Sequence, residues 1–146
     1  MILNGVISSG VAVTNTKGAV ILEGANTYTG ATTAESGAIV VNGSLASGSA
    51  VTVKSTGTLT GRGTVNGTVA VEAGGTLTPG FKEINKIITG NTTLNSVSIF
   101  AWELGETPVT TGRGTDYDAV NTSGLSGSDA IFRVVLNGTQ NFSESF

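Results

Sequence analysis

Four acidic residues in the C-terminal half of the chain have the greatest scope for chemistry. Glu103 and Glu106 lie close together in the sequence, and so do Asp116 and Asp118. Cleavage of a glycosidic bond needs two carboxyl groups about 5–10 Å apart. Alternate residues of a strand share a face, so Asp116 and Asp118 converge if their segment is extended. In a loop rich in Gly and Thr, however, Asp commonly caps a turn through its own backbone.

The pair Asp116 and Asp118 is also the candidate calcium site. Ca²⁺ takes six to eight oxygen ligands, and this loop offers two carboxylates, the Thr115 hydroxyl and backbone carbonyls. The glycine-rich nonapeptide that binds Ca²⁺ in β-helices is absent from the sequence. A simple turn is the competing interpretation, and no other residue is assigned to a metal, a cofactor or a catalytic role.

The composition excludes the common forms of nucleophilic catalysis. The 146 residues include no His and no Cys, so neither a Ser-His-Asp nor a Cys-His arrangement can form. The segment 61–67 (GRGTVNG) is superficially similar to a nucleotide-binding loop. Its third glycine lies one residue later than in the GxGxxG motif of nucleotide-binding proteins, and no helical pattern follows it. We therefore expect a turn at this segment, and no enzymatic activity.

Two aromatic residues could serve as platforms for a sugar ring. Trp102 alternates with Phe100 and Leu104, which favours packing of Trp102 inside the fold. Tyr28 lies within a repeat motif, which again favours a structural role.

The elements that must position these residues are short strands arranged in a repeat. Residues 50–60 fall on residues 68–78 after a shift of 18, residues 18–24 fall on residues 37–43 after a shift of 19, and Gly37 falls on Gly57 after a shift of 20. In each case apolar positions meet apolar positions and glycines meet glycines. A repeat of about 18–20 residues made of strands and glycine turns is typical of a β-solenoid.

The repeat predicts which side chains stack in successive turns. Equivalent positions should form continuous apolar columns, with Val51 over Val69 and Leu59 over Leu77. Seven or eight turns, stacked about 4.8 Å apart, would make a rod on the order of 35 Å long.

The whole chain, 1–146, is predicted to be a single solenoid segment. The clear repeats cover residues 3–80, and residues 81–146 should add further turns, with loops near 79–86 and 105–116. Between these loops Val97 and Ile99 alternate with Ser98, so both are expected to point inward. The sequence ends on an apolar pattern, and an open solenoid end is an unpaired sheet edge. We expect this chain to be a fragment of a longer protein.

Charge is sparse. Charged residues make up 12% of the chain and the net charge is −3. The seven basic residues are scattered, so a nucleic-acid partner is not expected. The sequence shows no sustained helical periodicity, no signal peptide and no apolar run long enough for a membrane helix.

Several segments resemble a known family. Residues 22–33 (LEGANTYTGATT) are similar to the autotransporter-associated β-strand repeat, also called the passenger-associated transport repeat. The pattern continues in residues 37–43 and 57–65, and it closes with residues 74–80 (GGTLTPG). The resemblance is strong over about residues 3–80 and weaker over 87–137. It implies a right-handed parallel β-helix in the passenger of a bacterial type V secreted protein, carried outward by a C-terminal β-barrel that this chain lacks.

The sequence thus predicts an all-β, right-handed parallel β-helix with a non-enzymatic, structural function. The resemblance implies an extracellular or cell-surface location on a Gram-negative outer membrane. Two alternatives stay open: a carbohydrate-binding or adhesive module, and a β-helical polysaccharide-active enzyme. The partners considered are a second copy of the chain, joined end to end or edge to edge, and a glycan or cell-surface ligand. No cofactor is expected.

Overall fold

The chain folds as a parallel β-solenoid of about five turns, with no helix in the described residues. The structure is a computed structural model, and it describes residues 1–80, 83–104 and 117–136. The strands of the solenoid lie on three faces. Every pairing between named strands is parallel, as expected when a chain coils repeatedly in one direction.

Two of the faces belong to one continuous sheet because the long strands β4 and β6 bend from the first face onto the second. The first face consists of β2 (Val13–Asn15), the N-terminal parts of β4 (Thr32–Val41) and β6 (Val51–Gly61), β8 (Val69–Val71), β11 (Thr92–Leu94) and β14 (Leu125–Gly127). The second face consists of β1 (Ile2–Leu3), β3 (Ala19–Leu22), the C-terminal parts of β4 and β6, β9 (Thr76–Pro79), β12 (Ile99–Leu104) and β15 (Ile131–Leu136).

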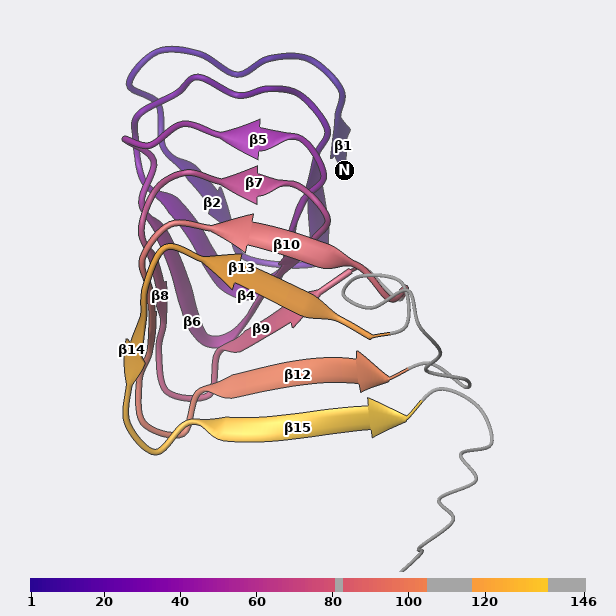
Figure 1. Cartoon of the computed structure of the whole chain (residues 1–146). Helices are drawn as coiled ribbons and strands as arrows, with labels where there is room; N and C mark the ends of the chain where they lie inside the picture. Colours follow the sequence, from indigo (N-terminus) through magenta and orange to yellow (C-terminus); the bar gives the residue numbers. More distant parts are fainter. Residues whose placement is uncertain (81–82, 105–116, 137–146) are drawn as a thin grey trace, which may run out of the picture.

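The third face is a separate sheet. It consists of β5 (Ser44–Leu45), β7 (Thr64–Val65), β10 (Lys86–Thr89) and β13 (Ala119–Thr122). In Figure 1 these strands lie one below another and cross the near side from right to left, while the chain returns across the far side as it descends. This path makes the solenoid right-handed.

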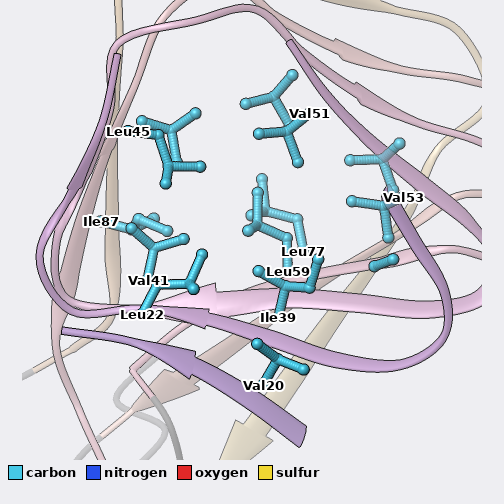
Figure 2. Packing of buried hydrophobic residues seen from close by; sticks show 14 of the residues in the cluster. Val20, Leu22, Ile39, Val41, Leu45, Val51, Val53, Leu59, Leu77 and Ile87 are labelled. Carbon is cyan, nitrogen blue, oxygen red and sulfur yellow. The ribbon is translucent and has the colours of Figure 1, made fainter. Parts of the chain in front are cut away.

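The interior is filled by apolar columns, as the repeat predicts. On the second face Val20, Ile39, Leu59 and Leu77 stack in register, and Phe100 continues the column. Val51 stacks on Val69 on the first face. Figure 2 shows these side chains converging on one interior from the surrounding strands. The predicted columns are therefore confirmed.

Glycine occupies a corner position because neighbouring turns approach too closely there for a side chain. Gly37 has a φ of 124°, and a Cβ at this position would lie 2.4 Å from the backbone oxygen of Gly18 in the turn before it. The corner recurs one turn later at Gly57, where a Cβ would lie 2.1 Å from the oxygen of Ala34. The shared corner explains why these glycines recur in the sequence.

The expected number of turns is wrong because the turns lengthen along the chain. Ile2 pairs with Ile21, an offset of 19, whereas Lys86 pairs with Ala119, an offset of 33. The excursion between Pro79 and Lys86 lengthens the turn before that one, in which Thr64 pairs with Ile88 at an offset of 24. About five turns spaced 4.8 Å apart give an axial length of roughly 24 Å, shorter than the expected rod.

The expected orientation of Val97 is also wrong. Val97 lies in a turn with a φ of 55° and is 51% exposed, while Ser98 is buried. The strand begins after this turn, at Ile99, and Phe100 stacks on Leu77 in the column. The tight turn before this strand determines which of its residues point inward. Period-two alternation in the sequence does not indicate such a turn.

Candidate functional site

Asp118 is a buried acidic residue that links three segments of the last turns. It is 1% exposed and directly precedes β13. One carboxylate oxygen accepts a hydrogen bond from the backbone N–H of Asn85, at 2.9 Å, and the other accepts one from the backbone N–H of Glu103, also at 2.9 Å. The backbone carbonyl of Asp118 accepts a third bond, from the indole N–H of Trp102. The residue therefore joins the start of β10, the strand β12 and the start of β13.

The surroundings of Asp118 disfavour its charged form. Burial raises its pKa to about 6, and the nearby Glu103 carboxylate adds to the rise. The hydrogen bonds from the N–H groups of Asn85 and Glu103 act in the opposite direction, because they stabilise the carboxylate. At neutral pH the group is mainly ionised, in a place where ionisation is unfavourable.

A cavity of about 260 Å³ lies beside Asp118, within the last turns of the solenoid. The described residues that line it are almost entirely apolar, and none of them is basic. They are Leu77, Leu94, Phe100, Trp102, Tyr117, Asp118, Ala119, Val120, Thr122 and Leu125. These residues come from strands and turns on all three faces of the solenoid.

Aromatic rings form one wall of this cavity. The ring centroids of Trp102 and Tyr117 are 5.6 Å apart, and the planes are inclined by 53°. Phe132, from the adjacent strand β15, contacts both Trp102 and Phe100, with centroid distances of 6.1 and 5.1 Å. Trp102 thus packs within the fold, as its alternation with Phe100 predicts.

The paired carboxylates proposed from the sequence can be compared with the structure only in part. Glu106 and Asp116 lie outside the described residues. Glu103 and Asp118 are brought together, but both oxygens of Asp118 are already engaged by backbone N–H groups. In the part of the chain that the structure describes, no group of three or more acidic, His or Cys side chains could hold a metal ion.

The repeat motif around Tyr28 is structural. Asn26 accepts a hydrogen bond from the N–H of Ile7 and donates from its amide to the carbonyls of Gly24 and Ser44, so it ties three successive turns together. Tyr28 is fully buried, and its hydroxyl lies 2.5 Å from the Thr32 hydroxyl. It offers no surface on which a sugar could stack. The segment 61–67 contains a corner of the solenoid, where Gly61 ends β6 with a φ of 122°, and then the short strand β7 at Thr64–Val65.

Sequence reasoning missed Asn85 and Tyr117. Asn85 contributes only a backbone N–H to Asp118, and the two residues are 33 positions apart. No side-chain pattern announces such a contact. Tyr117 stands next to Asp118 in the sequence, but its position in the cavity wall depends on the register of β10 and β13.

Comparison with known proteins does not identify the chain. It matches no protein-family model and no curated protein sequence. The resemblance of residues 22–33 to the autotransporter-associated repeat therefore stays a prediction. The described residues contain no helix long and apolar enough to cross a membrane.

Proposed function

We propose that this chain is a non-enzymatic structural segment, a stiff β-helical scaffold of a bacterial autotransporter-like surface or secreted protein. The observation that carries the proposal is the unbroken, in-register stacking of parallel strands along the solenoid. On the second face one register column runs from Val20 on β3 through successive turns to Phe132 on β15. Stacked neighbours of this kind hold the position of one end of a rod relative to the other.

The placement at the bacterial surface rests on the resemblance of the repeat motif. Asn26 and Tyr28, the distinctive residues of that motif, are used in this fold to join turns and fill the interior. This agrees with a repeat whose purpose is to build a solenoid. The contacts of Asn26 and Tyr28 therefore support the scaffold function more directly than they support a location at the bacterial surface.

We do not propose catalysis, because the candidate residues that the structure describes make contacts that hold strands of the solenoid together. Asp118 uses its two oxygens to fix β10 and β12, and the Trp102 indole N–H is committed to the Asp118 carbonyl. The cavity beside them has few polar groups to recognise sugar hydroxyls. These contacts favour the scaffold over the enzyme and the glycan-binding module.

Single-molecule pulling tests the mechanical part of the proposal. Handles would be attached through Thr14→Cys and Ser126→Cys, which lie on exposed positions of the first and last strands of the first face. The chain has no other cysteine, so attachment is specific. We expect a stiff response and then stepwise lengthening by whole turns, about 65 Å for a turn of 19 residues. Gradual extension at low force, like that of a Gly/Ser linker of equal length, would refute the scaffold.

Protease treatment of intact cells that express the natural protein tests its location. A surface segment should be cleaved without lysis, while a cytoplasmic control protein stays intact. Protection of the segment until the cells are lysed would refute surface exposure and leave the mechanical result unaffected.

A further inference from the structure

The cavity beside Asp118 combines three features that suit it to hold a ligand. It encloses about 260 Å³, its wall includes the rings of Phe100, Trp102 and Tyr117, and it contains a buried carboxylate. A dry cavity of about 150 Å³ is already large enough to bind benzene. The space is therefore sufficient for a small organic molecule.

The charges around the cavity favour a cation over a neutral molecule. Among the described residues that line the cavity none is basic, and Glu103 is close enough to Asp118 to raise its pKa. Burial has already removed the Asp118 carboxylate from water, which disfavours its charged form. A cation placed near the carboxylate would offset this desolvation penalty. The chain as a whole carries a net charge of −3.

The rings favour a cation with a bulky, weakly hydrated charge. The faces of Trp and Tyr attract cations within about 6 Å of the ring centroid, and quaternary ammonium groups are held by aromatic walls of this type. Trp102 and Tyr117, 5.6 Å apart and inclined to each other, make two sides of such a wall. An inorganic metal ion would need more oxygen ligands than this apolar lining supplies.

We propose that this cavity binds a small organic cation of the quaternary ammonium class, with its charged group between the Trp102 and Tyr117 rings and the Asp118 carboxylate. This site is independent of the scaffold function. It would make the last turns of the solenoid a recognition element as well as a structural one.

The test compares choline with 3,3-dimethylbutan-1-ol, which has the same shape but carries a carbon in place of the charged nitrogen. Trp102 is the only tryptophan of the chain and lines the cavity, so its fluorescence reports binding directly. Each compound is titrated at pH 7.5 and constant ionic strength. We expect a saturable change with choline, and binding of choline at least roughly fivefold tighter than binding of the alcohol. Equal binding of the two, or no saturable change with choline, overturns the proposal.

A matched pair of variants locates the site. Tyr117→Leu removes a ring from the cavity wall, and Phe132→Leu removes a ring that contacts Trp102 but does not line the cavity. By calorimetry, we expect choline affinity to fall roughly fivefold in the first variant and less than about twofold in the second. No loss in a folded Tyr117→Leu protein overturns the assignment. If circular dichroism shows that Tyr117→Leu is unfolded, the comparison of choline with its neutral isostere decides alone.

Discussion

Replacing Gly37 by Ala should destabilise the solenoid strongly, because two independent penalties meet at this corner. The backbone of Gly37 has a φ of 124°, which L-residues rarely adopt. An added Cβ would also lie 2.4 Å from the oxygen and 2.9 Å from the nitrogen of Gly18, both backbone atoms that cannot rotate away. The same oxygen of Gly18 accepts the N–H of Ala38, so moving it also disturbs the ladder.

Two glycines of the same chain separate these penalties. Gly18 has a φ of 71° but no atom within 4 Å of an added Cβ, so Gly18→Ala carries only the backbone penalty, about 1–2 kcal/mol. Gly10 has open space and no such φ, so Gly10→Ala should change the free energy of unfolding by less than about 0.5 kcal/mol. Gly37→Ala adds the displacement of a neighbouring turn, about 1–3 kcal/mol, and should total about 2–5 kcal/mol.

Urea denaturation followed by far-UV circular dichroism measures all three variants. The reasoning predicts the order Gly37→Ala, then Gly18→Ala, then Gly10→Ala, from most to least destabilising. If Gly37→Ala is no more destabilising than Gly18→Ala, the close approach of successive turns at this corner is wrong.

Three further predictions use the same denaturation assay. Val97→Gly should stabilise the chain by about 1 kcal/mol, because it relieves a β-branched residue at a φ of 55°; a loss of stability would contradict the turn geometry. Leu59→Ala should lower the free energy of unfolding by about 2–5 kcal/mol, because Leu59 is fully buried. Ile88→Ala, at a position 39% exposed, should lower it by less than about 1 kcal/mol. Equal effects of the two variants would contradict the stacking of Leu59 in the apolar column of the second face. Because the pKa of Asp118 is raised from 3.8 to about 6 in the folded state, its protonated form favours folding, and its contribution is lost as pH rises through that window, by about 3 kcal/mol at most. Asp118→Asn should remove this part of the pH dependence, and an unchanged profile would show that Asp118 is not its source.

The stacking of the early turns could be predicted because the repeat in the sequence shows which positions of successive turns are equivalent. When one turn lies on the next, residues at equal positions share an environment, so Val51 and Val69, or Leu59 and Leu77, are chosen by the same constraint. The offset between such residues then gives the length of the turn. This logic holds while the turns have similar lengths.

The later turns could not be counted in this way. The excursion before β10 raises the offset between Thr64 and Ile88 to 24, and the longer path from β10 to β13 raises the next offset to 33, so a shift of 18–20 finds no match there. Val97 shows a second limit. It alternates with Ser98 and Ile99 as strand residues do, but its backbone forms a turn that is usually made by glycine, as at Gly74 in the preceding turn.

Of the candidate site, the residue Asp118 was visible in the sequence but its role was not. A carboxylate two residues from another suggests metal binding or catalysis, whereas the structure uses Asp118 to fix distant backbone N–H groups. These contacts use only the backbone N–H groups of Asn85 and Glu103, so no pattern of side chains in the sequence indicates them. The cavity could not be predicted either, because its lining residues are spread along the sequence from Leu77 to Leu125.

Disulfide trapping between turns tests the central claim, in-register parallel stacking, most directly. Thr52 and Ala70 are register partners on β6 and β8, and Ala70 in turn pairs with Thr93 on β11. Neighbouring strands bring paired Cα atoms to about 4.8 Å, within the range for a disulfide, and the chain has no native cysteine to interfere. We expect Thr52→Cys with Ala70→Cys to form an intramolecular disulfide readily, and Thr52→Cys with Thr93→Cys, two turns apart, not to do so. Equal trapping of both pairs, or failure of the first, would contradict the solenoid register.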